Sequence, residues 1–201
     1  MSSVLIDSQF FGTINYINTL FQYSNIIIES CESFRKMSFR NRCLIVGSNG
    51  LIGLSLPLVQ GRDHRQLMKD VRINYQGRWQ AEQLRTLDSC YARSPYYEYY
   101  RDEVRSLWEQ KHPLLLEKNG AALQWLARVF SWKGRIGYTE KYQAVYDPAE
   151  VTDMRNRILP KNYRQWPAPR YTQVFEERTG FAPNLCILDL LFCNGPTLNT
   201  I

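Results

Sequence analysis

Two clusters of side chains in this sequence have the types and spacing to do chemistry, and the first lies near the C-terminus. In the run 175–196, Glu176, Glu177 and Arg178 precede an apolar helical stretch whose only charged residue is Asp189. A helix that is apolar on all sides is normally buried, and a carboxylate there is costly unless it is paired and hydrogen-bonded. We therefore expect a charge held in the interior, with Asp189, Glu176 and Glu177 as candidate catalytic residues.

The second cluster is a basic turn after the second expected strand. It consists of Arg35, Lys36, Ser38, Arg40, Asn41 and Arg42. Guanidinium forks and an ammonium group in one short turn suit recognition of phosphate or carboxylate, and a solvated turn without a ligand is the alternative. The binding residues expected here are Lys36, Arg40, Asn41 and Arg42. We expect Arg40 and Arg42 to have acidic partners. We expect Asp189 to contact a cation or several hydrogen-bond donors, and Arg178 and this turn are its leading candidate partners.

Other polar residues follow the first two expected strands. Gln9 opens the loop after the first strand. An amide there can hydrogen-bond to a ligand through its donor and its acceptor, and the alternative is an ordinary polar loop residue. Glu29 and Glu32 could act as general bases or as ion partners of the basic turn, and we favour the second role. Cys31 lies between them, but it has no histidine near it in sequence to activate a nucleophilic thiol.

The hydrophobic periodicity predicts the elements that position these groups. Strands are expected at residues 4–7, 26–29, 42–46, 51–59 and 71–74. The first two flank a helical pattern at 13–23, which is typical of a βαβ unit. Asn49-Gly50 joins the third and fourth strands, and this dipeptide favours a type I′ hairpin in which both central residues have positive φ.

The second half of the chain is expected to be mainly helical. From 79 to 142 the pattern has a helical period, and Pro95 and Pro113 divide it into three helices. Residues 147–169 contain four prolines and resemble a surface loop or lid, or a connection of no consequence. Residues 171–175 read as a strand.

These patterns predict an α/β or α+β fold with a small mixed sheet from the N-terminal part, a helical middle region and a buried C-terminal helix. Asn184 is expected to cap that helix, and Asn194 with the following Gly-Pro to end it. A length of 201 residues favours one domain. Its expected parts are a βαβ-like opening and hairpin at 1–75, a mainly helical part at 76–145, a loop at 146–170, and a strand and buried helix at 171–201.

Composition limits the classes of protein. The chain is 44% hydrophobic, enough for a sizeable core, and it lacks both a secretory signal and an apolar run long enough to cross a membrane, so we expect a cytoplasmic protein. Five scattered cysteines and two histidines form no paired metal ligands, so no metal site is predicted. No phosphate-binding loop or dinucleotide motif occurs, so the cofactor stays unknown.

The net charge of +6 suits an anionic small molecule, such as a nucleotide, a sugar nucleotide or a CoA ester, although many proteins carry this charge without such a ligand. RNA is a less favoured partner. It would use the charge and the tyrosines of 96–100, which are more readily explained by helix packing.

Several of these features together resemble the WbqC-like protein family. The matching features are 36–43 (KMSFRNRC), the Asn49-Gly50 turn with 54–57 (LSLP), Trp79, 91–100 and the block 175–196. The resemblance runs from about Gln9 to Pro196. The positions that coincide with polar motif residues of the family are Gln9, Lys36, Arg40, Asn41, Arg42, Asn49, Glu176, Glu177, Arg178, Asn184, Asp189 and Asn194. Two departures are Phe10, where many relatives have proline, and Ser30-Cys31, where many have acidic residues.

The family takes its name from a gene of bacterial O-antigen clusters, so the resemblance implies surface-polysaccharide or modified-sugar metabolism. We therefore expect an acyl or glycosyl transferase that acts on an anionic activated donor or sugar nucleotide. The candidate binding residues are Gln9, Lys36, Arg40, Asn41, Arg42, Asn49, Arg178, Asn184 and Asn194. A non-catalytic interaction or regulatory protein is the alternative.

Overall fold

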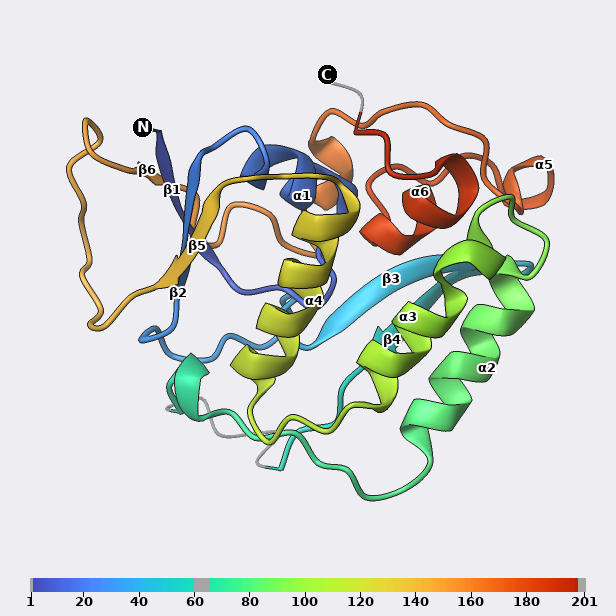
Figure 1. The fold of residues 1–201 in the computed structure, drawn as a ribbon, viewed down its shortest axis with the longest axis horizontal. Coiled ribbons are helices and arrows are strands. Elements are labelled where there is room, and N and C mark those ends of the chain that lie inside the picture. The colour runs from blue at the N-terminus through green and yellow to red at the C-terminus, as the bar shows by residue number, and fades with distance from the viewer. Residues whose placement is uncertain (1, 60–65, 199–201) are drawn as a thin grey trace.

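The structure is a computed structural model that describes residues 2–59 and 66–198. In chain order its elements are β1 (Ser3–Asp7), α1 (Ile14–Leu20), β2 (Asn25–Glu29), β3 (Arg42–Gly47), β4 (Gly50–Ser55), η1 (Met68–Asp70), α2 (Trp79–Tyr91), α3 (Tyr97–Glu109), α4 (Leu115–Val129), β5 (Arg135–Tyr138), β6 (Thr152–Asp153), η2 (Tyr163–Gln165), α5 (Glu176–Thr179) and α6 (Ile187–Asn194). Within the described residues, four parallel strands form a sheet in the order β5-β2-β1-β6, and β3 and β4 form a separate hairpin (Figure 1). The predicted mixed α/β fold is confirmed.

The centre of the sheet is the predicted βαβ unit. β1 and β2 pair in parallel, with Val4 opposite Ile26 and Asp7 opposite Glu29. Both strands are short runs of branched apolar residues, which suit a parallel strand covered on both faces. The loop before α1 bends sharply at Gly12, where φ is 61° and a Cβ atom would lie 2.6 Å from the Tyr16 ring, so a side chain is strained at this position.

The outer strands of the sheet differ from the prediction. β5 lies in the part expected to be helical, and β6 lies in the part expected to be a loop. β5 pairs with β2, and the two residues of β6 pair with β1. Residues 71–74, predicted as an edge strand, form isolated bridges instead. A strand of two residues is too short to show any hydrophobic periodicity. β6 is defined only by its backbone pairing with β1.

The hairpin is confirmed, but its turn is not of the predicted type. Gly47 pairs with Gly50, so Ser48 and Asn49 form the connection. Of these turn residues, all of them described, only Gly50 has a positive φ, of 107°. A type I′ turn needs two positive φ values at its centre. The prediction of that turn type was therefore wrong.

The three helices of the middle region are confirmed as α2, α3 and α4. Trp108 on α3 is fully buried and stacks on Phe11 at a ring distance of 5.0 Å. The Lys118 ammonium group of α4 donates hydrogen bonds to the carbonyl oxygens of Leu107 (2.5 Å), Trp108 (3.0 Å) and Gln110 (2.6 Å) at the end of α3. This interaction satisfies acceptors that a helix end leaves open and joins the two helices.

The C-terminal helix is buried as predicted, although its flanks differ. α6 contacts α1, α3 and β3, and Asp189 is 0% exposed. Residues 171–175 form an irregular segment rather than the predicted strand. Asn184 does not cap α6, because its amide donates to the carbonyl oxygens of Tyr163 (3.0 Å) and Trp166 (2.8 Å). Gly195, with φ of 75°, ends the helix as expected.

None of the helices in the described residues combines the length and apolar composition that a membrane crossing requires. All five cysteines are free thiols, and four of them are buried.

Candidate functional site

Carboxylates gather at one edge of the parallel sheet. Asp7, Glu29 and Asp153 are the last residues of β1, β2 and β6, and parallel strands place their carboxyl ends at the same edge. The connection after β1 leads to β2 on one side, while β6 joins β1 from the other side. In open α/β sheets, a crevice at such a reversal is the usual ligand position.

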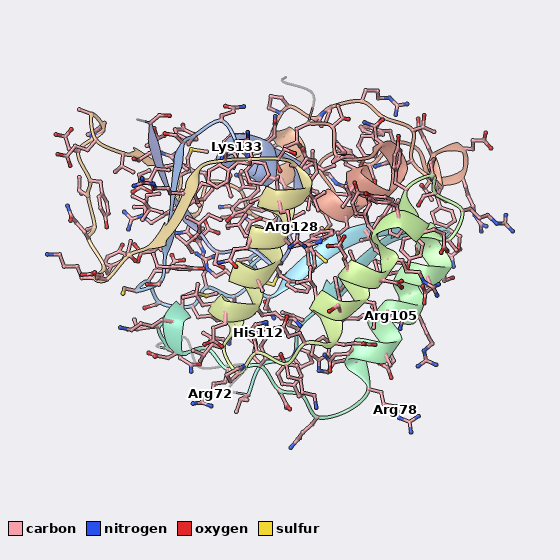
Figure 2. All side chains as sticks on the ribbon, in the orientation of Figure 1. Arg72, Arg78, Arg105, His112, Arg128 and Lys133 are labelled. Atoms are coloured by element: carbon pink, nitrogen blue, oxygen red, sulfur yellow. The ribbon has the colours of Figure 1, made fainter. Side chains whose placement is uncertain are left out.

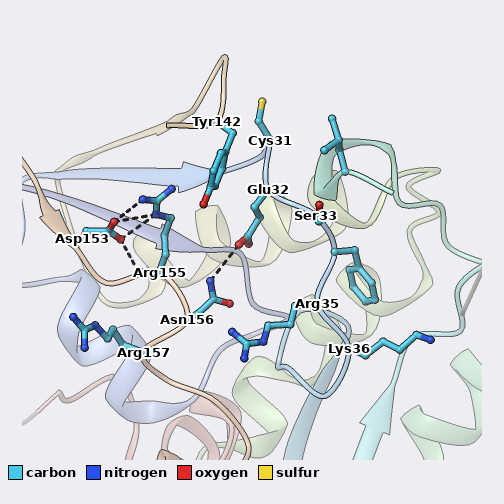
Figure 3. A pocket seen from close by; sticks show the side chains of 12 residues that line it. Cys31, Glu32, Ser33, Arg35, Lys36, Tyr142, Asp153, Arg155, Asn156 and Arg157 are labelled. Carbon is cyan, nitrogen blue, oxygen red and sulfur yellow. Dashed lines mark hydrogen bonds and ion pairs between the residues drawn. The ribbon is translucent and has the colours of Figure 1, made fainter. Parts of the chain in front are cut away.

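A pocket of about 1040 Å³ opens at this edge (Figure 3). Its walls come mainly from the segment after β2 and from the end of β6 with the segment that follows, and Leu67 and Tyr142 complete the lining. The lining residues are Cys31, Glu32, Ser33, Phe34, Arg35, Lys36, Leu67, Tyr142, Asp153, Arg155, Asn156 and Arg157. We call this cavity the basic pocket, because four of its residues are cationic and two are acidic.

Arg40 lies behind the basic pocket and is fully buried at 0% exposure. Its guanidinium group donates from Nε (3.0 Å) and from Nη2 to Oε1 of Glu32, and from Nη2 to Oδ1 of Asn156 (2.9 Å). Nη1 forms an ion pair with Oδ2 of Asp7 at 3.6 Å. The acidic partner predicted for Arg40 is therefore confirmed, but burial keeps this residue from contacting a ligand directly.

Glu32 is the carboxylate of this group that faces the pocket. Burial raises its pKa above the ordinary value, and the nearby Arg40 only partly offsets this effect. Arg40 holds Oε1, whereas Oε2 accepts only a long bond of 3.4 Å from Asn156 among the described residues. A buried carboxyl group with a raised pKa and one lightly engaged oxygen can accept or donate a proton.

A second network fixes Arg155 at the other wall. Its side chain binds Asp153 from Nε (3.0 Å) and Nη2 (2.6 Å), and Nη1 binds Oε2 of the fully buried Glu29 at 3.0 Å. Burial would raise the pKa of Asp153, but the hydrogen bonds from Arg155 bring it below its ordinary value. Backbone of the preceding segment is held as well, since Arg155 donates to the carbonyl oxygens of Gln143 (2.9 Å) and Ala144 (3.2 Å).

In these two networks, Arg40 and Arg155 neutralise the carboxylates at the edge of the sheet. Two other arginines lie at the rim of the pocket. Arg35 and Arg157 are exposed, and their guanidinium groups make no hydrogen bond or ion pair with another described residue. Figure 3 shows that they come from the two different walls. Guanidinium groups placed in this way can bind a phosphate or carboxylate.

Asp189 belongs to a separate, closed cluster. It accepts hydrogen bonds from the hydroxyl groups of Tyr91 (2.6 Å) and Tyr171 and from the amide of Gln173 (3.0 Å). Burial raises the pKa of Asp189, and these donors only partly lower it. The predicted burial and donors are confirmed, but the expected partner was wrong, because tyrosines and an amide take the place of Arg178 or the basic turn.

The other two candidate catalytic acids lie outside this cluster, Glu176 partly buried and Glu177 exposed. Glu176 and Glu177 line a second cavity of about 760 Å³, and Tyr171 connects that cavity to Asp189. Glu176 is paired with Arg170, with Nη1 3.0 Å from Oε2. Their assignment as catalytic residues stays a prediction.

The other expected binding residues are distributed over the molecule. Arg178 meets Asn49 at 3.3 Å, Asn41 donates to the carbonyl oxygen of Leu56, and Asn184 and Asn194 flank or end α6. Arg42 was expected to have an acidic partner, but it donates to the Ser38 carbonyl oxygen (3.0 Å) and contacts the Met37 sulfur (3.6 Å). The residue that does line the basic pocket is Lys36.

Gln9 lines a separate small chamber instead of the basic pocket. Its Nε2 donates to the Ile158 carbonyl oxygen at 3.1 Å. The chamber has a volume of about 10 Å³, and Asn119 and Tyr138 also line it. Neither Oε1 of Gln9 nor Oδ1 of Asn119 has a hydrogen-bond partner among the described residues.

The residues that sequence reasoning missed are Asp7, Asp153, Arg155, Asn156 and Arg157. Asp7 carried a readable signal, because it ends an expected strand just as Glu29 does. Asp153 ends the two-residue strand β6 and the other three follow it, in a segment without periodicity, so no local pattern pointed to them. Asn156 has a positive φ of 57°, which asparagine tolerates better than most residues, and its N–H binds Oδ1 of Asp7 at 2.7 Å.

A model of the WbqC-like protein family matches residues 7–158, so the chain belongs to this family. Every residue that lines the basic pocket lies inside the matched range. Asp189 and the block 175–196, which contributed to the resemblance, lie outside it. Searches of curated proteins and of solved structures find no match for the chain.

Proposed function

We propose that the protein is a cytoplasmic transferase whose basic pocket binds an anionic activated donor, from which an acyl or glycosyl group moves to an acceptor in surface-polysaccharide or modified-sugar metabolism. The observation that carries the proposal is the pair of rim arginines, Arg35 and Arg157, whose guanidinium groups make no hydrogen bond or ion pair with another described residue and line a pocket at the carboxyl edge of the sheet. Guanidinium groups placed there with their hydrogen-bond donors unused suit an anionic ligand.

Glu32 gives the pocket a group for the transfer itself. The acceptor's oxygen or nitrogen attacks the acyl carbon or the anomeric carbon, the bond to the anionic leaving group breaks, and Glu32 takes the acceptor's proton. Its raised pKa brings its proton affinity closer to the working pH, which favours general base catalysis. Glu32 also has a structural role as the partner of Arg40, whereas a purely structural role for the pocket would not need the rim arginines.

The first test measures binding of inorganic pyrophosphate and a panel of sugar nucleotides and acyl donors by isothermal titration calorimetry at low ionic strength. Arg35→Ala and Arg157→Ala should each weaken binding about 10- to 100-fold, because each removes a charge-assisted hydrogen bond. Arg78→Ala is the matched control, since Arg78 is exposed at the start of α2, away from the parallel sheet (Figure 2).

The expected affinity also falls as salt is added, because exposed charges are screened. If no anionic probe binds, or if Arg78→Ala weakens binding as much as the pocket variants do, the proposed donor site is wrong. Binding without group transfer to any acceptor in the panel would favour the non-catalytic alternative.

A further inference from the structure

We propose that the ligand of the basic pocket is a nucleotide, whose planar ring stacks on Tyr142 while its phosphates bind Arg35 and Arg157. This inference rests on the proposed function, because it names the class of ligand that the anion site takes. In the view of Figure 3, Tyr142 lies in the upper part of the pocket, and both arginines lie in the lower part, on two different segments. The pocket therefore offers an aromatic face and cations to one bound molecule.

Tyr142 is available to a ligand and not needed by the core. It lines the basic pocket, yet it is 56% exposed. It lies on the segment 139–151 between β5 and β6, which extends outward on the left of Figure 1. A tyrosine that belonged to the hydrophobic core would bury its ring, as Tyr91 does at 0% exposure. Exposed aromatic rings beside cationic groups are the usual platforms for nucleobases.

The ring of Tyr142 is also held in place. The Arg155 guanidinium carbon lies 5.3 Å from the centre of the Tyr142 ring and 5.2 Å from that of Tyr146, within the range of cation–π attraction. Arg155 is fixed by Glu29 and Asp153 and binds the carbonyl oxygens of the residues that follow Tyr142. Little conformational freedom is then lost when a base stacks on the ring, and this favours affinity.

The size of the pocket agrees with a nucleotide. Its volume of about 1040 Å³ lies at the upper end of the range for small-molecule sites. An inorganic phosphate would fill a small part of this space, which also has room for a base, a ribose and a diphosphate.

The experiment compares ADP, UDP and pyrophosphate as probes by isothermal titration calorimetry with the full chain at one salt concentration. Stacking predicts that ADP and UDP bind about 5- to 100-fold more tightly than pyrophosphate. Tyr142→Ala should remove this advantage and leave pyrophosphate binding within about twofold, while Tyr142→Phe should retain it. Tyr99→Ala is the control, because Tyr99 is 76% exposed on α3 and does not line the pocket.

The outcomes separate this inference from the proposed function. Pyrophosphate binding as tight as that of ADP, with both lost in Arg35→Ala, would overturn the nucleotide and leave the anion site standing. Tighter nucleotide binding that Tyr142→Ala does not change would overturn the stacking role of Tyr142. Absence of binding by all three probes would overturn the anion site itself. Melting temperatures of the variants show whether each one is folded.

Discussion

Replacing Arg40 with methionine removes the cation at the centre of the most buried charge network. The change deletes two hydrogen bonds to Glu32, one to Asn156 and the ion pair to Asp7. Asp7 and Glu32 are 1% and 7% exposed, so water replaces the lost partner poorly. Removing one partner of a buried ion pair typically costs about 3–5 kcal/mol. For a chain of 201 residues, this corresponds to a fall of about 6–20 °C in the melting temperature.

The assay is urea unfolding followed by tryptophan fluorescence, with Arg35→Met as the control. Arg35 belongs to the same basic turn but is exposed, so its replacement should change the free energy of unfolding by less than about 0.5 kcal/mol. A loss near 3 kcal/mol in the Arg40 variant and near zero in the Arg35 variant is therefore expected.

The pH dependence provides the sharper check. The pKa of Glu32 is raised in the folded state, so between its unfolded and folded pKa values the folded state binds more protons and stability falls as pH rises. Arg40 normally lowers this pKa, so its removal widens that window. The loss in Arg40→Met should be smaller at pH 5 than at pH 7, and adding Glu32→Gln should recover part of it. A loss below about 1 kcal/mol, or one independent of pH, would refute this account of the network.

Three further outcomes are expected. Asp189→Leu should cost at least about 3 kcal/mol, because three donors lose their acceptor, whereas Asp189→Asn should cost less than half as much; equal losses in urea unfolding would contradict this. A high-resolution crystal structure should show one ordered water that donates hydrogen bonds to Gln9 Oε1 and Asn119 Oδ1, because their chamber of about 10 Å³ has room for one molecule. An empty chamber would contradict this. Burial lowers the pKa of Lys118 to about 8, so above that pH the unfolded state binds more protons than the folded state. The free energy of unfolding of the native protein, relative to that of Lys118→Met, should therefore rise between about pH 8 and 10. A difference that does not change with pH would show that the pKa is ordinary.

The predictable part of the fold is the part with local periodicity. β1, α1 and β2 each follow from a few adjacent apolar residues, and so do the three helices of the middle region. β6 has two residues and exists because Val4 and Leu5 present an open backbone edge to a segment almost 150 positions later. Such a pairing leaves no pattern in the strand itself. The outer strands of the sheet were therefore beyond local reasoning.

The candidate site was predictable in its residue types but not in its geometry. A basic turn with acidic partners was a correct expectation for Arg40, yet arginine is almost never fully buried unless paired, and its partners Asp7 and Asn156 come from different segments. Burial of Asp189 followed from its apolar neighbours. Its donor Tyr91 lies 98 positions away, so the sequence could not show that a hydroxyl group would replace a cation there.

The four arginines around the pocket form two groups, one that stabilises the fold and one that is available to bind a ligand. Arg40 and Arg155 each neutralise carboxylates at the ends of strands, and through them the loops after β2 and β6 are fastened to the same sheet edge. Arg35 and Arg157 lie on those two loops and take no part in these ion pairs. Loss of a buried arginine should therefore lower both stability and ligand affinity, whereas loss of a rim arginine should lower affinity alone. A site built in this way can change its ligand by substitution at the rim without weakening the sheet edge that carries it.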